Sequence, residues 1–305
     1  MSIRSEGSAR LDEMLAYSLE SGGKRIRPAL TLLSGKLHQY RLESLLPMAA
    51  AIELMHTATL VHDDAIDKSA VRRAKSTVYC VWGEAKAILL GDFLFAKAGE
   101  MATDTRSLPA VRLFTETLAT ISTGEMNQSF SAFNLRQTRE QYLERIARKT
   151  ASLFALSTES GGLLSQASIP ATRALKEYGY HLGIAFQITD DILDFTSTEK
   201  SMGKPIGSDL AQGTLTLPSM LILKRYPDNP VKRLFESHDR LSEPEKQALV
   251  TEAREIVCGS NIAEECRRVA SEYSKKACDY IGTLPPGEIR RALEKLASFI
   301  LTRRK

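Results

Sequence analysis

The stretch "LVHDDAIDKSAVRR", residues 60–73, places three acids and two adjacent arginines directly after an apolar run. The residues before it are apolar or small almost throughout, which predicts a central helix buried on most sides. On such a helix Asp63 and Asp67 lie one turn apart and face the same way. Like charges about 6 Å apart repel by roughly 2–3 kcal/mol at an effective dielectric near 20. The stretch therefore predicts a compensating cation close to its carboxylates.

A second acid cluster repeats this spacing. The stretch "ITDDILDF", residues 188–195, again reads Asp-Asp-x-x-Asp and again closes a mostly apolar helix. One such cluster is most simply a solvated edge, but acids at a helix C-terminus oppose the macrodipole, and two copies favour a shared function. Oxygen-only ligands suit Mg²⁺, which keeps several waters and is usually shared with substrate phosphates. The six acids are Asp63, Asp64, Asp67, Asp190, Asp191 and Asp194.

Basic residues around the two clusters predict anion binding. The segment "GGKRIRP", residues 22–28, is expected to form a glycine-led turn that enters a helix at Pro28, which is a favourable place for an anion. Any single one of these cations is more often a surface residue than a ligand. Together they predict two anionic groups, one bound through metal and the other bound directly by Lys and Arg. The cations are Lys24, Arg27, Arg72, Arg73, Lys149 and Lys204.

Composition excludes several classes of protein. The chain has 305 residues and a net charge of +4, so it lacks the broad basic field of nucleic-acid binders. Four scattered cysteines without ligand spacing are typical of a reduced intracellular protein. No uninterrupted apolar run approaches the roughly 18 residues of a membrane span, and the N-terminus lacks a signal-peptide core. We therefore expect a cytoplasmic protein without stable membrane insertion.

The remaining segments predict an all-α chain. Two helix starts have capping-box spacing, Thr138 with Gln141 and Ser242 with Glu245. No alternating strand pattern occurs, and no internal boundary divides the chain, so residues 1–305 are predicted to form one domain. The segment 196–214, "TSTEKSMGKPIGSDLAQGT", is too long for a tight connection and predicts a functional lid.

The motifs resemble those of the trans-prenyl diphosphate synthases. "GGKRIRP", "LVHDDAIDKSAVRR", "GEMNQ", "RKTASLF", "GIAFQITDDILDF" and "GKPIGSDLAQGTLTLP" occur in that family's order between residues 20 and 220. The resemblance implies the isoprenoid synthase fold, a single-domain barrel of long helices around a central apolar cavity. It also implies a homodimer that condenses isopentenyl diphosphate head-to-tail with an allylic prenyl diphosphate.

The resemblance also implies a role for each matching position. Mg²⁺ would bridge to the allylic diphosphate from Asp63, Asp67 and Asp190, and the other acids of the clusters would be close partners. The same diphosphate would be held by Arg72, Lys149 and Lys204. The diphosphate of isopentenyl diphosphate would be bound by Lys24, Arg27, His56 and Arg73. The reacting centre would be lined by Thr150 and Gln187, and the lid would be positioned by Asp209.

Two positions bear on the binding of the allylic diphosphate and on the length of the product. Thr214 stands where the family often has Lys, which weakens the expected hold on the allylic diphosphate. Ala58 lies just before Asp63, where members with short products often carry an aromatic residue, so we expect a product longer than geranylgeranyl diphosphate. Thr59 and Met55 would complete the cavity floor. The segment 117–130 could close the tunnel instead, with the aromatic candidates Phe130 and Phe133.

Four other functions compete with this interpretation. A short-chain farnesyl or geranylgeranyl diphosphate synthase would share every motif. An enzyme that cyclises prenyl diphosphates or couples them head-to-head would not explain "GGKRIRP", because a cyclase needs no second diphosphate pocket. An impaired subunit of a heteromeric synthase would usually lack acids from one cluster. Glu53 and His56 have the i, i+3 spacing of di-iron bundles, but no second Glu-x-x-His occurs.

Overall fold

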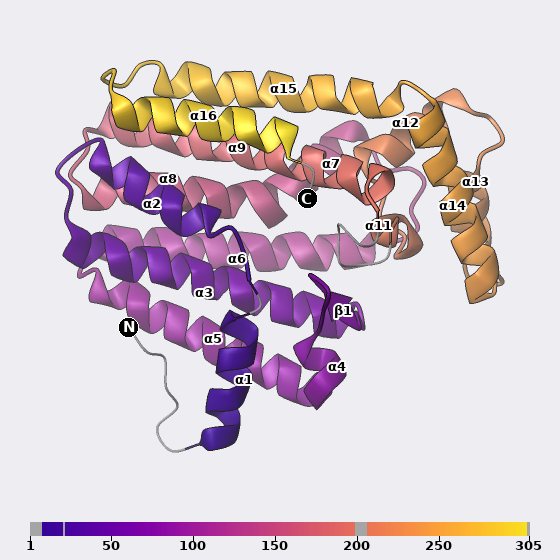
Figure 1. The fold of residues 1–305 in the computed structure, drawn as a ribbon, viewed down its shortest axis with the longest axis horizontal. Coiled ribbons are helices and arrows are strands. Elements are labelled where there is room, and N and C mark those ends of the chain that lie inside the picture. The colour runs from indigo at the N-terminus through magenta and orange to yellow at the C-terminus, as the bar shows by residue number, and fades with distance from the viewer. Residues whose placement is uncertain (1–7, 21, 199–205, 304–305) are drawn as a thin grey trace. The chain divides into compact units, whose positions relative to one another are not determined.

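The computed structural model describes residues 8–20, 22–198 and 206–303, and it is built almost entirely from helices (Figure 1). The predicted all-α class is confirmed. The chain divides into two compact units. The N-terminal unit comprises Met1–Leu118 and Leu156–Ser168, and the C-terminal unit comprises Ala119–Ala155 and Ile169–Lys305.

The N-terminal unit is organised around a long apolar helix, α3. Its elements are α1 (Ala9–Leu19), α2 (Ile26–Lys36), α3 (Leu42–Ile66), β1 (Val71–Arg72), β2 (Lys75–Ser76), α4 (Val78–Trp82) and α5 (Glu84–Asp104), with the start of α6 (Leu108–Phe130) and most of α8 (Ser152–Leu164). Helix α3 packs mainly on α5 and next on α2 (Figure 1). Gly91 of α5 permits this approach, because a Cβ there would lie 2.1 Å from the ring of His62.

Helix α3 is long and apolar enough to cross a membrane by length and composition alone. More than half of its most apolar window is buried inside the protein, as in the core helix of a folded domain. Met55 and Ala58 are fully buried. This composition is therefore weak evidence for a membrane span.

A short hairpin, which the sequence pattern did not predict, follows α3. Val71 pairs with Ser76, and Arg72 pairs with Lys75. The two loop residues between the strands, Arg73 and Ala74, have φ of 54° and 60°, as a two-residue hairpin turn with both residues left-handed requires. Strands of two residues are too short to show alternation. The hairpin begins within the opening motif and carries its two arginines, Arg72 in β1 and Arg73 in the turn.

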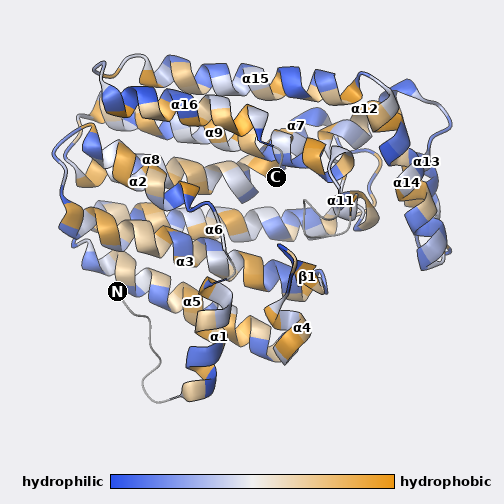
Figure 2. Ribbon diagram, in the orientation of Figure 1, coloured by the Kyte–Doolittle hydropathy of each residue, from blue (hydrophilic) through white to orange (hydrophobic). Residues whose placement is uncertain are grey.

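The C-terminal unit is organised around α9. Its elements are the rest of α6, α7 (Arg139–Ile146), a π-helical turn (Ala147–Ala151), the start of α8, α9 (Ile169–Thr196), α11 (Ser208–Ala211), α12 (Leu217–Arg225), α13 (Pro230–Ser237), α14 (Glu243–Gly259), α15 (Ile262–Ile281) and α16 (Glu288–Thr302). Helices α9, α15 and α16 lie side by side (Figure 1). Hydrophobic and hydrophilic residues alternate along α15 and α16, as expected of amphipathic helices (Figure 2).

Two local predictions are confirmed in this unit. Thr138 with Gln141 starts α7 as a capping box, and Ser242 with Glu245 starts α14 in the same way. The core of the unit buries one face of α9. Acids of α9 that are buried with that face therefore require hydrogen-bond partners from the surrounding elements.

Candidate active site

The first acid cluster closes α3. The helix ends at Ile66, and Asp67 is its C-cap, with its N–H donating to the carbonyl of Asp63 at 2.8 Å. Asp67 is exposed and Asp63 half-buried, whereas Asp64 is buried. Arg72 donates from Nε to Asp64 Oδ1 at 2.7 Å. Burial raises the pKa of Asp64, and the guanidinium of Arg72 opposes that rise.

Four arginines surround His56 on the same unit. Burial lowers the pKa of His56 well below its usual value, and the positive charges of Arg27, Arg73, Arg72 and Arg25 lower it further. We call these four arginines with His56 the arginine cluster. A neutral imidazole among guanidinium groups can donate a hydrogen bond without adding to their mutual repulsion. The arginine cluster is therefore suited to a multiply charged anion such as a diphosphate.

The turn before α2 builds part of this cluster. Arg25 adopts φ of 49° and pairs with Glu53 of α3, while Arg73 donates to the carbonyl of Gly22. Sequence reasoning missed Arg25, although it stands inside the quoted "GGKRIRP" motif. The ion pair with Arg25 gives Glu53 a partner other than the iron of the di-iron alternative. Lys24 is exposed in the same turn, and α2 begins at Ile26, two residues earlier than the expected helix entry at Pro28.

The second acid cluster lies within α9. Because the helix continues to Thr196, Asp194 is buried instead of ending the helix. It accepts hydrogen bonds from Ser208 Oγ at 3.2 Å and from the backbone N–H of Asp209 at 3.4 Å. Its own carbonyl accepts from the N–H of Gly207 at 3.0 Å. Asp194 thus holds the end of α9 against α11, the short helix that contains Asp209.

The middle acid of this cluster belongs to a buried hydrogen-bond chain. Tyr142 of α7 donates to Asp191 Oδ2 at 2.7 Å, and Gln187 donates from Nε2 to Asp191 Oδ1 at 2.8 Å. Thr150 donates to Gln187 Oε1 at 2.7 Å. Burial raises the pKa of Asp191 to about 7, Asp209 adds to the rise, and the bonds from Gln187 and Tyr142 oppose it. Thr150 and Gln187, both expected at the reacting centre, are thus hydrogen-bonded to each other, and the chain adds Tyr142, which was not predicted.

A π-helical turn carries Lys149 and Thr150. Such turns are frequent at functional sites. Gly183 lets α9 approach this turn closely, because a Cβ there would lie 2.5 Å from the Cα of Ala151. Lys149 Nζ is held between the carboxylate oxygens of Glu125 at 2.8 and 2.9 Å. Glu125 lies in the "GEMNQ" motif and was quoted without an assigned role.

The remaining acid, Asp190, is paired with the C-terminal end of the described chain. Arg303 donates to Asp190 Oδ1 at 2.7 Å and to the carbonyl of Phe186 at 3.2 Å. Its guanidinium lies 3.8 Å from the centre of the Phe186 ring. Arg303, which sequence reasoning also missed, lies 113 residues from its partner. A half-exposed carboxylate with one ionic partner is chemically able to take a cation instead.

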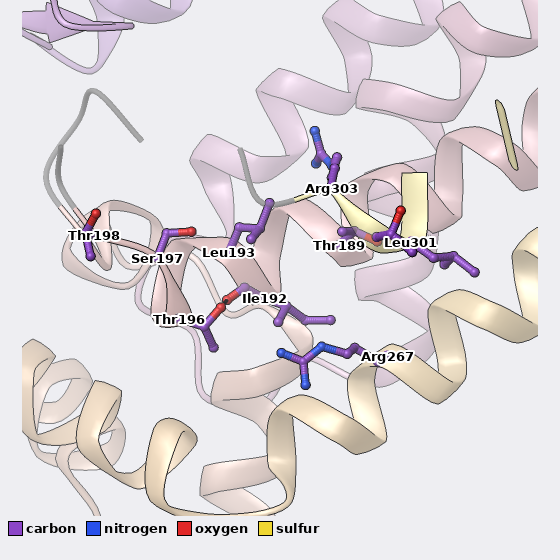
Figure 3. A pocket seen from close by; sticks show the side chains of 10 residues that line it. Thr189, Ile192, Leu193, Thr196, Ser197, Thr198, Arg267, Leu301 and Arg303 are labelled. Atoms are coloured by element: carbon purple, nitrogen blue, oxygen red, sulfur yellow. Dashed lines mark hydrogen bonds between the residues drawn. The ribbon is translucent and has the colours of Figure 1, made fainter. Parts of the chain in front are cut away.

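A cavity of about 550 Å³ opens beside Arg303, on another face of α9 (Figure 3). Thr189, Ile192 and Leu193 contribute to its wall, and Arg267 comes from α15. None of the predicted site residues lines it. This cavity therefore lies apart from the side chains of the predicted site.

Several other predicted positions can be placed. Thr214 is half-buried, and its N–H donates to the carbonyl of Asp209 at 2.8 Å. Thr59 is half-buried and donates to the carbonyl of His56 at 2.8 Å. Lys204 lies outside the described residues. Phe130 is exposed, whereas the ring of Phe133 stacks on His238 with 3.9 Å between ring centres. Those contacts give Phe133 a role in the core of its own unit.

The chemistry of the acids fits a hard divalent cation. Asp63, Asp67 and Asp190 offer carboxylate oxygens only, the ligand type that Mg²⁺ prefers. Among the residues that the structure describes, no group of three His, Cys, Asp or Glu side chains could hold a metal ion by itself.

Comparison with known proteins identifies the family. The profile of the polyprenyl synthetase family matches residues 8–257. Heptaprenyl diphosphate synthase component 2 of Bacillus subtilis is 37% identical over 95% of this chain and 82% of its own length.

Two solved structures agree with the match. A polyprenyl synthase from Caulobacter crescentus, complexed with calcium and isoprenyl diphosphate, has a TM-score of 0.92 at 34% identity, covering 99% of this chain and 91% of that one. A heptaprenyl diphosphate synthase from Staphylococcus aureus has a TM-score of 0.91 at 38% identity, covering 99% and 94%. The two aspartate-rich motifs and the all-α fold thus place this chain in the polyprenyl synthetase family of trans-prenyltransferases.

Proposed function

We propose that this chain is a Mg²⁺-dependent prenyltransferase that adds isopentenyl diphosphate head-to-tail to an allylic prenyl diphosphate. Its product would be an all-trans polyprenyl diphosphate longer than geranylgeranyl diphosphate. The observation that carries the proposal is the pairing of two aspartate-rich motifs with an arginine cluster, which provides for two diphosphates. The Caulobacter relative, complexed with calcium and isoprenyl diphosphate, supports the same ligand classes.

The residues divide between the two diphosphates. Asp63, Asp67 and Asp190 would hold Mg²⁺, which when bound supplies positive charge to the diphosphate leaving group. Further charge on that diphosphate would be stabilised by Lys149 and Arg72, each of which would exchange its carboxylate partner for phosphate oxygens. Lys204 lies outside the residues that the structure describes, so its contribution to binding this diphosphate rests on the motif alone. The diphosphate of isopentenyl diphosphate would be bound by Lys24, Arg25, Arg27, His56 and Arg73.

The reaction requires stabilisation of charge and no protein nucleophile. The allylic C–O bond breaks with its electron pair leaving on pyrophosphate, and fixed cations stabilise that charge as it develops. The isopentenyl double bond then supplies the pair for the new C–C bond. A proton leaves the adjacent carbon for the departing pyrophosphate. Thr150 and Gln187 present oxygen atoms near the reacting carbon, and apolar walls exclude water that would quench the cation.

We assign the control of product length to residues of α3 that would form the floor of the cavity. Ala58 and Met55 are fully buried one and two turns before Asp63, and the methyl group of Ala58 leaves room for a growing chain. Two of the relatives reported above carry heptaprenyl names, which supports a long product. Ala58→Phe should shorten the product by one or more five-carbon units, measured by chromatography of dephosphorylated products. An unchanged chain length would remove Ala58 from the floor.

A two-component enzyme is the second candidate. The Bacillus subtilis relative is named component 2 of a heptaprenyl diphosphate synthase, so a partner polypeptide is a specific alternative to a homodimer. Both aspartate-rich motifs are intact, which favours the subunit that carries the chemistry. Native mass spectrometry of the purified chain gives its oligomeric state, with a homodimer expected.

The direct test incubates the purified chain with Mg²⁺, labelled isopentenyl diphosphate and farnesyl diphosphate, and sizes the products. Products longer than twenty carbons are expected, and omission of Mg²⁺ should abolish them. Products that stop at twenty carbons would indicate the short-chain alternative. A folded protein that incorporates no label with any allylic primer would refute the synthase assignment.

A further inference from the structure

The hydrogen-bond chain of the C-terminal unit has a fixed direction. Thr150 has a single hydroxyl proton, and it donates this proton to Gln187 Oε1 at 2.7 Å. The lone pairs of the hydroxyl are then the only groups it can offer to a ligand. The direction of this bond therefore decides whether the reacting centre meets an electron-rich oxygen or an O–H proton.

The orientation of the Gln187 amide sets that direction. Its Nε2 donates to Asp191 Oδ1 at 2.8 Å, which leaves Oε1 facing Thr150. With Asp191 ionised, a flipped amide would place Oε1 against a carboxylate oxygen, where neither atom carries a proton, and would present N–H to Thr150. Asp191 therefore selects the amide orientation that makes the Thr150 oxygen an acceptor.

Tyr142 fixes Asp191 in turn. The phenol donates to Asp191 Oδ2 at 2.7 Å, and Tyr142 is fully buried. Burial raises the pKa of Tyr142 well above its usual value, so the phenol keeps its proton and remains a donor. With one donor on each carboxylate oxygen, rotation of the Asp191 carboxylate would break two hydrogen bonds at once.

We propose that Tyr142 is a positioning residue of the prenyl transfer reaction: through Asp191 it fixes the Gln187 amide, and through Gln187 it fixes the Thr150 hydroxyl as an acceptor facing the reacting carbon. This inference rests on the proposed function. It assigns no ligand contact to Tyr142 itself. Loss of its hydroxyl should therefore slow the chemical step and leave the binding of both diphosphates intact.

Tyr142→Phe removes the hydroxyl and keeps the ring, including its place 5.5 Å from the guanidinium of Arg145. The matched control is Tyr178→Phe. Tyr178 is also fully buried in the same unit, and its hydroxyl donates to the carbonyl of Leu293 at 2.9 Å, away from the chain of bonds. We expect both variants to lower the thermal midpoint by similar amounts, because each loses one buried hydrogen bond.

Steady-state kinetics with Mg²⁺, isopentenyl diphosphate and farnesyl diphosphate separate the two roles. We expect Tyr142→Phe to lower kcat roughly tenfold, with both KM values within about twofold of wild type. Tyr178→Phe should retain wild-type kcat. In a Gln187→Leu background, Tyr142→Phe should lower kcat further by less than about twofold, because Gln187, through which Tyr142 is proposed to act, is absent.

Three outcomes are decisive. A wild-type enzyme without activity would refute the proposed function and the inference with it. An active wild type with equal kcat for the two Tyr→Phe variants, or an undiminished cost in the Gln187→Leu background, would refute the positioning role alone. If Tyr142→Phe does not fold, Asp191→Asn tests the same link, because it replaces one of the two acceptor oxygens by an NH2 group, which cannot accept from Tyr142 or from Gln187. Wild-type kcat in that variant would refute the positioning role.

Discussion

The two acid clusters have the same spacing but different surroundings. Their middle acids are alike, because Asp64 and Asp191 are both buried, both have a raised pKa, and both accept hydrogen bonds from neighbouring side chains. Their last acids differ. Asp67 ends α3 and is exposed, whereas Asp194 lies inside α9 and is buried against α11. The first motif therefore ends in an exposed acid, and the second uses its last acid to hold α11.

This difference arises from where each helix ends. Helix α3 stops at Ile66, and α9 continues to Thr196, two residues beyond its last acid. Within the second cluster, Asp190 is the half-exposed acid, and Arg303 is its partner in the structure. Under the proposed function, the two motifs would thus divide metal binding and structural support between them.

Asp67→Asn should have the largest effect on activity. The side chain is exposed at a helix C-terminus, where a negative charge opposes the macrodipole, so its loss should leave the thermal midpoint unchanged or slightly higher. Activity should fall by about 100-fold or more, because a cation that stabilises the leaving group loses a ligand. Steady-state kinetics across a Mg²⁺ series measure the loss. Near-normal kcat at moderate Mg²⁺ would show that Asp67 is not a ligand.

Asp194→Ala should mainly lower the free energy of unfolding. Removal of the buried acceptor leaves the Ser208 hydroxyl and the Asp209 N–H without that partner, which should cost about 1–3 kcal/mol of unfolding free energy. Denaturant unfolding followed by circular dichroism measures this cost. Ser208→Ala is the control, because it removes one donor and keeps the other, and it should cost less. Equal stability of the Asp194→Ala variant and the wild type would contradict the structural role.

Arg303→Gln should have the smallest effect. It removes the positive charge beside Asp190, so binding of Mg²⁺ with the allylic diphosphate should strengthen by about threefold, the scale of a partly exposed ion pair. Calorimetric titration measures that change. Arg267→Gln, which also borders the cavity in Figure 3, is the control and should leave the affinity unchanged. Weaker binding in the Arg303→Gln variant would mean that Arg303 assists the ligand instead of competing for Asp190.

The sequence predicted those features that depend on local pattern. The acids at the end of α3 and the two capping boxes followed from local spacing, whereas α9, which was also expected to close with its acids, continues to Thr196. Thr150 and Gln187, which the family motifs assign to one centre, are hydrogen-bonded to each other. Tyr142 and Arg303 could not be found in this way, because their partners lie 49 and 113 residues away along the chain and Arg303 lies beyond the end of α16. The hairpin was missed because strands of two residues carry no alternation.

The difference between the two motifs can be measured most directly through binding. Calorimetry would follow the Mg²⁺-dependent binding of a thiolo analogue of farnesyl diphosphate, which ionises too slowly to react. The three proteins are the wild type, Asp67→Asn and Asp194→Asn, each at a temperature where it is fully folded. We expect Asp67→Asn to weaken binding at least about tenfold and Asp194→Asn to stay within about threefold of wild type. Equal losses in the two variants would contradict the division of roles.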